Sequence, residues 1–229
     1  MTDQSEDPLA CEKCGLCHNR THVVVPTACE PGGLLAIGEA PGEAEDLTAR
    51  GFVGAAGQRL DELLRRCGFS RGRQYGVANI VRCRPPGNRK PRKDEIKACI
   101  PLLAEAIVNI RPSVLLLVGN TAADAILGKG TLEPKIEASR VNPRCGFTAA
   151  HPAFAQRLRT IDPALYSAGM LTIPMPHTSG LSWNGRSRKG ERWSVIGTQQ
   201  IRIACALVSG RPIESLDDDG AARQGTLDI

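Results

Sequence analysis

The sequence has no apolar run long enough to cross a bilayer and no basic start of the kind that opens an export signal. Its longest apolar run, Val114–Val118, is far shorter than the roughly 20 residues that a spanning helix needs. Residues Met1–Asp7 are acidic, whereas a secretory signal would be basic. There is no internal repeat, and 41% hydrophobic with 23% charged residues is an ordinary globular composition. We therefore expect a cytoplasmic protein with no membrane segment.

Without an export signal, the nine cysteines argue against a disulfide framework and for metal ligation or buried thiols. Cys11 and Cys14 have the spacing that lets neighbouring thiolates hold one metal, and Cys83 and Cys99 form a second, wider pair. Four thiolates suit either a 4Fe-4S cluster or structural zinc. A zinc ribbon normally shows a second short Cys pair, so the spacing favours iron–sulfur. Unligated core thiols are the third interpretation.

Hydrophobic periodicity predicts four strands that alternate with helices. The strands are expected at 34–37, 76–83, 113–119 and 170–175, and the helices at 54–67, 94–110, 120–127 and 191–208. Residues 128–165 are dotted with Pro and Gly and are predicted to be irregular, with one or two short elements. This alternation predicts one three-layer α/β/α domain over residues 11–208, with a central, mostly parallel four-stranded sheet. Residues 1–10 and 209–229 are predicted to be disordered.

Three of the predicted strands run into polar loops, at Gly38–Asp46, Asn79–Arg84 and His177–Asn184. The carboxyl ends of parallel strands share one edge of the sheet, where ligands bind in open α/β folds. The acidic loop by itself is equally consistent with a strand-to-helix turn that carries solvated acids. Basic residues gather in Arg82–Lys93 and Arg186–Arg192, and the net charge is +5. This balance permits nucleic-acid binding, although basic clusters are also common solvated faces.

Three segments together carry a resemblance: Gly38-Glu-Ala-Pro-Gly-Glu43, Gly51-Phe-Val-Gly54 and Asn79-Ile-Val-Arg-Cys-Arg-Pro-Pro-Gly-Asn-Arg89. In this order and spacing, the chain resembles the iron–sulfur, family-four type of uracil-DNA glycosylases over roughly residues 11 to 127. The resemblance implies a monofunctional enzyme of base excision repair, which flips uracil out of DNA and hydrolyses its N-glycosidic bond to leave an abasic site. It also places Cys11, Cys14, Cys83 and Cys99 on the ligand positions of a 4Fe-4S cluster.

The C-terminal half departs from that family's pattern. The family usually ends its last strand in His-Pro-Ser, whereas this chain has His177-Thr178-Ser179. Residues 130–169 have no counterpart that we can place. His151-Pro152 keeps a His-Pro pair but follows no predicted strand, so we treat it as a decoy. We expect a divergent branch of the family.

The chemistry of uracil release suggests roles for three residues that would contact the base. His177 is the predicted donor to the base oxygen on which charge develops, with a surface turn histidine as the alternative. Asn79 matches the N3–H and O4 edge of uracil, although asparagine at a strand end is often a turn former. Phe52, one of four phenylalanines, is the predicted stacking platform for a flipped base, or else a core residue.

Among the nearby acids Glu39, Glu43, Glu45 and Asp46, we favour Glu39 for positioning the attacking water, and the water's partner stays open. Many uracil-DNA glycosylases place an aspartate where this chain has Ala40, so catalysis is expected to depend mainly on stabilising the leaving group. Gly38 and Ala40 complete the predicted uracil pocket beside Phe52, Asn79 and His177.

The predicted partner is uracil-containing DNA, single- or double-stranded, bound by a monomer in the cytoplasm of a bacterial-type cell, in association with the nucleoid. Expected DNA contacts are Arg82, Arg84, Arg89, Lys90, Ser179, Leu181 and Arg186. Leu181 is the predicted wedge for the gap left by the flipped base, with Trp183 as the other candidate.

Two non-enzymatic alternatives remain at this stage. One is a non-catalytic or covalently trapping protein that binds uracil or damaged DNA on the same fold. No basic, histidine-containing insertion follows Phe52, which argues against the trapping variant. The other is a zinc-stabilised nucleic-acid adaptor without chemistry.

Overall fold

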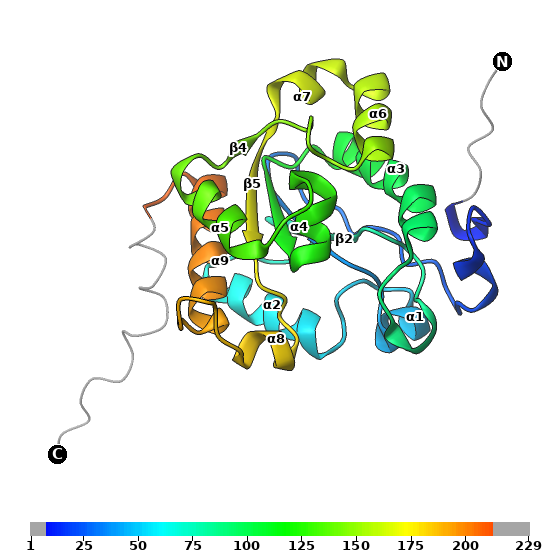
Figure 1. Ribbon diagram of the computed structural model, residues 1–229, viewed down its shortest axis with the longest axis horizontal. Coiled ribbons are helices and arrows are strands. Elements are labelled where there is room, and N and C mark those ends of the chain that lie inside the picture. The colour runs from blue at the N-terminus through cyan, green and yellow to red at the C-terminus, as the bar shows by residue number, and fades with distance from the viewer. Residues whose placement is uncertain (1–7, 213–229) are drawn as a thin grey trace.

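Five strands form one sheet in the order β2-β1-β3-β5-β4 (Figure 1). This is a computed structural model, and it describes residues 8–212. The strands are β1 (Leu34–Gly38), β2 (Tyr75–Asn79), β3 (Val114–Val118), β4 (Arg144–Cys145) and β5 (Met170–Met175). β2, β1, β3 and β5 pair in parallel, as predicted. The prediction of four strands was wrong by one, because β4 is a two-residue antiparallel strand, too short to show a period of its own.

The helices that cover the sheet are also more numerous than the periodicity predicted. They are α1 (Glu43–Thr48), α2 (Ala55–Arg66), α3 (Lys93–Ile110), α4 (Asn120–Leu127), α5 (Leu132–Val141), α6 (Pro152–Ile161), α7 (Pro163–Ala168), α8 (Gly180–Asn184) and α9 (Trp193–Ser209). The expectation that 128–165 is irregular was wrong, because α5, α6 and part of α7 lie there. Pro152 and Pro163 open helices at their first positions, where a missing N–H costs nothing.

The two faces of the sheet are covered by different helices, which gives the predicted three layers. Leu34, Ala36 and Leu116 point to the face covered by α2 and α9. Leu35 and Leu115 point to the opposite face, toward α3, α4 and α6. The strands are buried on both sides, as expected for parallel strands between helical layers.

The strand order places the ends of four strands around one crevice. The chain passes from β1 to β2 on one side and later returns to β3 on the other, so the direction of winding reverses between β1 and β3. Ligands of open α/β sheets bind at such a switch point, outside the carboxyl ends of the strands. Here those ends carry Gly38, Asn79, Gly119 and the loop that begins at Pro176.

The predicted disordered ends fall mostly outside the described residues. Within them, Pro8–Ala10 forms a short 3-10 helix and α9 ends at Ser209. Among the helices that the structure describes, none combines the length and apolar character that a membrane crossing requires.

The start of α2 depends on a glycine that packs against the Phe52 loop. A Cβ added to Gly57 would lie 2.2 Å from the Phe52 carbonyl carbon and oxygen. We expect Gly57→Ala to lower the free energy of unfolding by about 1–3 kcal/mol, because backbone must move to admit the methyl group. Urea denaturation measures the change, and Gly146→Ala is the control because no atom lies within 4 Å of its added Cβ. Equal stability of the two variants would contradict this packing.

Candidate active site

A cleft of about 700 Å³ lies at the carboxyl ends of the strands. It brings together all six residues that the sequence assigned to catalysis and uracil binding, from four separate segments. These are Gly38, Glu39, Ala40, Phe52, Asn79 and His177, and Arg89, Ser179 and Leu181 also line the cleft.

Gly38 has no side chain, and the Asn79 and Phe52 side chains pack closely against its backbone. A Cβ at this position would lie 2.6 Å from Asn79 Oδ1 and 2.7 Å from Phe52 Cζ. Asn79 is 8% exposed, and no residue in the described range hydrogen-bonds its side-chain amide. The absence of a side chain at Gly38 therefore leaves room for the tip of the Phe52 ring and for the Asn79 amide oxygen.

Phe52 has a strained backbone that neighbouring side chains hold in place. Its φ is +57°, in the left-handed region that a bulky residue rarely adopts. Arg71 donates to the Phe52 carbonyl (2.8 Å) and to the carbonyl before it (2.6 Å). Glu45 accepts from the N–H groups of Val53 (2.9 Å) and Gly54 (2.8 Å). No role was predicted for Arg71 from the sequence. Glu45 was considered only as a candidate partner of the attacking water, whereas both carboxylate oxygens of Glu45 accept from backbone N–H groups.

His177 is held as a neutral ring by burial and by one backbone hydrogen bond. The Ser179 N–H donates to His177 Nδ1 (3.1 Å), so the proton of the neutral imidazole lies on Nε2. Burial lowers the pKa of His177 below its ordinary value of 6.5, and the negative charge of Glu39 opposes this only in part. At neutral pH the ring is therefore uncharged and offers its Nε2–H as a hydrogen-bond donor.

The turn after β3 supports both His177 and Glu39. Gly119 has a φ of +91°, and a Cβ there would lie 3.3 Å from His177 Cβ and from His177 Cδ2. Thr121, in the first turn of α4, donates its hydroxyl hydrogen to Glu39 Oε2. The sequence showed Gly119 only as the end of a predicted strand and Thr121 only as part of the following helix, so it gave no signal for this support.

The predicted wedge Leu181 is 96% exposed at the mouth of the cleft. Trp183, the other candidate, is 8% exposed and packs against Gly197 of α9, which excludes it as a wedge. Arg186 is exposed and donates to the Gly190 carbonyl (2.6 Å) within its own loop.

The basic loop after β2 divides between two places. Arg89 reaches the cleft and makes a paired ion contact with the buried Glu95 (2.7 and 2.9 Å). Arg84 bonds Asn88 Oδ1 (2.8 Å) and Lys90 is exposed. Arg82 points away, because its guanidinium donates to the Leu102 carbonyl (2.9 Å) beside the cysteines. The structure thus places Arg82 with the cysteine group and not with the cleft.

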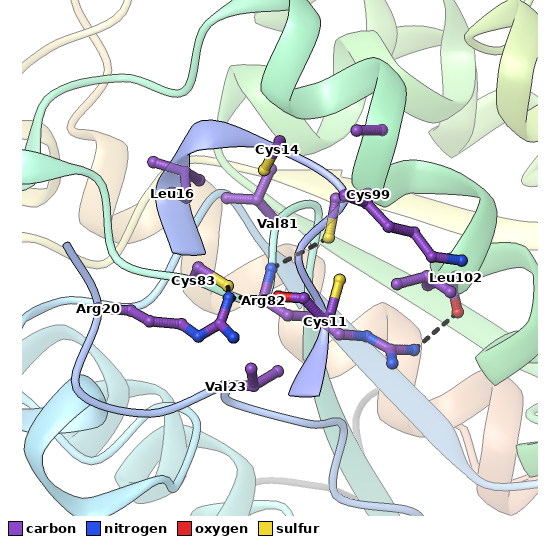
Figure 2. A pocket seen from close by; sticks show the side chains of 12 residues that line it. Cys11, Cys14, Leu16, Arg20, Val23, Val81, Arg82, Cys83, Cys99 and Leu102 are labelled. Carbon is purple, nitrogen blue, oxygen red and sulfur yellow. Dashed lines mark hydrogen bonds between the residues drawn. The ribbon is translucent and has the colours of Figure 1, made fainter. Parts of the chain in front are cut away.

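The four predicted ligand cysteines line one small cavity, with their sulfur atoms directed toward it (Figure 2). Cys11 and Cys14 both precede the short 3-10 helix at Gly15–His18, Cys83 follows β2, and Cys99 lies in α3. Burial raises the pKa of Cys99 to about 12, and it also raises the pKa values of Cys14 and Cys83. Each of these three thiols is further disfavoured as an anion by one or more of the other ligand cysteines.

Two N–H donors point at these sulfurs. Arg20 Nη1 lies 3.4 Å from Cys83 Sγ and also donates to the Cys11 carbonyl (2.7 Å), and the Arg82 backbone N–H donates to Cys99 Sγ (3.3 Å). Four soft sulfur ligands with N–H donors around them fit an iron–sulfur cluster in their chemistry. Within residues 8–212, no group of three or more His, Cys, Asp and Glu side chains has the spacing of ligands to a single metal ion.

His151 lies outside the cleft. Its Nδ1 accepts from the Ala153 N–H (3.3 Å) and caps the start of α6. This placement agrees with the interpretation of His151-Pro152 as a decoy.

Comparison with known proteins gives concordant matches. The sequence profile of the Uracil DNA glycosylase superfamily matches residues 28–196. A Type-4 uracil-DNA glycosylase of Pyrobaculum aerophilum is 41% identical over 117 residues, which are 51% of this chain and 59% of that protein. A Type-4 uracil-DNA glycosylase of Thermotoga maritima is 38% identical over 160 residues, which are 68% and 83% of the two chains. The matches to the proteins of Pyrobaculum aerophilum and Sulfurisphaera tokodaii span only 59% and 56% of their lengths.

Glu95 offers a test of how the basic loop is held. The ion contact with Arg89 lowers the pKa of Glu95 from 4.5 to about 2. A carboxylate whose pKa is lowered in the folded protein stabilises the fold at pH values above its pKa in the unfolded chain. This contribution should therefore be lost as the pH falls from about 4.5 to about 2. We expect Glu95→Gln to be less stable than the parent protein at pH 7, with the difference narrowing across that window. Thermal unfolding at several pH values measures it.

The exposed pair Arg66–Glu62 supplies the control, because an exposed ion pair contributes little to stability. Glu62→Gln should therefore leave the melting temperature nearly unchanged. If Glu95→Gln and Glu62→Gln have the same small effect at pH 7, the contact does not hold the loop.

Proposed function

Because this chain belongs to the uracil DNA glycosylase superfamily, we propose that it excises uracil from DNA by hydrolysis of the N-glycosidic bond, leaving an abasic site. The observation that carries the proposal is that Phe52, Asn79 and His177 line one cleft, with Phe52 and Asn79 packed closely against Gly38. These residues supply a stacking face, an amide edge and a neutral N–H donor. A flipped pyrimidine needs all three.

Base recognition would fall to Asn79 and Phe52. A side-chain amide offers an acceptor for the uracil N3–H and a donor for O4, whereas cytosine presents the opposite pattern at these two positions. Asn79 is buried, so a wrong base would leave polar groups without partners in a desolvated site. Phe52 would stack on the flipped ring, and its strained backbone is consistent with a functional position.

His177 would stabilise the leaving group. As the bond between C1′ and N1 breaks, its electron pair moves onto the uracil ring, and the remaining oxygen, O2, gains charge. The Ser179 N–H selects the neutral tautomer with its proton on Nε2, so the ring can donate to that oxygen without any change of protonation. One preorganised donor of this kind lowers the activation free energy by about 3–4 kcal/mol.

Glu39 would orient the water that attacks C1′ once the sugar has gained oxocarbenium character. Its carboxylate accepts from Thr121, which fixes one oxygen and leaves the other for a water molecule. This chain has Ala40 at the position where many uracil-DNA glycosylases carry an aspartate, so that position supplies no second carboxylate. Leaving-group stabilisation should then supply most of the rate enhancement.

Phosphate contacts from Arg84, Arg89 and Lys90 and insertion of Leu181 would hold the DNA with its base flipped. Leu181 is almost fully exposed, which suits a side chain that enters the base stack. Phosphate contacts make such binding strongly dependent on salt. The monomeric state and the cytoplasmic, nucleoid-associated location remain predictions.

We also propose that Cys11, Cys14, Cys83 and Cys99 hold a 4Fe-4S cluster. The cluster would tie the N-terminal segment to β2 and α3, and its role would be structural. The four cysteines would hold the cluster as thiolates and would release their protons to solvent on binding, although burial keeps the thiols neutral without it. Arg20 and the Arg82 N–H would then donate to ligand sulfurs.

The excision proposal predicts a large loss of activity in two variants. We expect His177→Ala to lower kcat by about 10²–10³-fold, the cost of removing one preorganised donor. Asn79→Ala should lower kcat/KM by about 100-fold or more, because the base edge loses its partner. Release of abasic product from a uracil-containing oligonucleotide under multiple turnover measures both. His151→Ala and Asn142→Ala, which lie outside the cleft, are the matched controls.

The pH profile adds a second readout. Because the pKa of His177 is lowered, the acidic limb of kcat/KM should lie below pH 6.5 in the parent protein. Unchanged turnover in both variants would contradict the site, and tight uracil-DNA binding without turnover would instead indicate a binding protein.

Metal analysis tests the cluster. Anaerobically purified protein should contain about four iron and four sulfide per chain and absorb in the visible range. Cys83→Ser and Cys99→Ser should lose most of the iron, whereas Cys145→Ser, on the β4 edge, should keep it. Zinc in place of iron would overturn the cluster and favour a structural zinc site.

A further inference from the structure

The residue after His177 is docked on a helix that comes much earlier in the chain. Thr178 is 0% exposed and does not line the cleft. Its hydroxyl donates to the Ala56 carbonyl (2.7 Å), and Arg59 Nη1 donates to the Thr178 carbonyl (2.5 Å). One residue of the His177 loop is thus tied to α2 through its side chain and its backbone, across 122 and 119 residues of sequence.

The same turn of α2 fixes the opposite wall of the cleft. Gly57 lies between Ala56 and Arg59, and its Cα packs so closely on Phe52 that an added Cβ would come within 2.2 Å of the Phe52 backbone. The left-handed conformation of Phe52 leaves its loop little freedom to follow a displaced helix. The distance between the stacking ring and the histidine loop is therefore set by one helical turn.

We propose that Thr178, together with Arg59, is a positioning residue that holds the His177 loop against α2, so that the imidazole faces a base stacked on Phe52. This inference rests on the proposed uracil excision for its kinetic consequence. Thr178 acts through its neighbour, because it is buried outside the cleft. A proline, which the resemblance leads one to expect here, could not make the hydroxyl bond to Ala56. This chain uses two hydrogen bonds at that point.

The position of the His177 ring relative to the bound base should have a large effect on kcat. A displacement of about 1 Å in a catalytic group can lower the rate about 100-fold, even when the fold is intact. The Ser179 N–H that fixes the tautomer of His177 belongs to the same turn, so loosening Thr178 would also loosen that bond. The charged groups facing this turn are Glu39, from the loop after β1, and Arg59, from α2.

The test compares Thr178→Val, which removes the hydroxyl at nearly constant shape, with Thr178→Ser, which keeps it. We expect Thr178→Val to lower kcat about 10- to 100-fold with KM changed less than about threefold, and Thr178→Ser to recover most of the rate. Thr160→Val is the matched control, because Thr160 makes the same type of hydroxyl-to-carbonyl bond, to Gln156, at an exposed position of α6. Arg59→Lys, which removes the guanidinium donor to the Thr178 carbonyl, should give a smaller loss in the same direction.

A titration of the His177 ring by NMR reports placement without any need for activity. In the parent protein the ring should titrate below its ordinary value, and in Thr178→Val its pKa should rise toward that value as the ring reaches solvent. A Thr178→Val protein that melts earlier but keeps kcat and the His177 titration would overturn the proposal. If Thr178→Val does not fold, Arg59→Lys decides by the same two readouts. A parent protein that releases no uracil refutes the proposed function, while the titration still decides the positioning role.

Discussion

Parallel pairing of β2, β1, β3 and β5 is the constraint on which the rest of the site depends. It brings the carboxyl ends of strands that lie far apart in sequence to one edge, with β1 paired to both β2 and β3. Gly38, Asn79 and His177 each follow or end one of these strands, so their proximity is a consequence of strand register. The reversal of winding at β1 and β3 opens the crevice there. Helices α2 and α4 then fix the loops that leave the strands.

In the proposed reaction, catalysis would depend on a histidine kept neutral and not on a strong base. Burial disfavours imidazolium more than the nearby Glu39 carboxylate favours it, so the lowered pKa decides the charge state. Glu39 itself is engaged by Thr121 and stands beside Ala40 where a second acid is missing. Charge on the departing uracil would be stabilised by a fixed N–H donor. That arrangement suits a reaction whose transition state forms the anion on the base and the cation on the sugar.

Some of this could be predicted from the sequence, and the reasons are physical. Strand β5 and the central β3 were placed within a residue, because short, mostly apolar runs bounded by Gly and Pro are typical of buried strands. His177, Asn79 and the four cysteines were found because their residue types limit the chemistry they can perform. Helices α5 to α7 were missed, since Pro152 and Pro163 indicated breaks where they open helices. Thr178 and Arg71 were missed as site residues because their partners are set by tertiary packing and leave no local pattern. Glu45 was considered only for the attacking water, and its hydrogen bonds to the loop after Phe52 were not foreseen.

The neutral state of His177 with its proton on Nε2 is tested most directly by ¹⁵N NMR of the imidazole in labelled protein. We expect the ring nitrogen pattern of the Nε2–H tautomer at pH 7.5, and a titration to imidazolium whose midpoint lies below pH 6.5. Addition of uracil-containing DNA with a non-hydrolysable sugar should leave that tautomer unchanged and shift the Nε2 proton. A proton on Nδ1 at pH 7.5, or a titration midpoint at or above pH 6.5, would contradict the account.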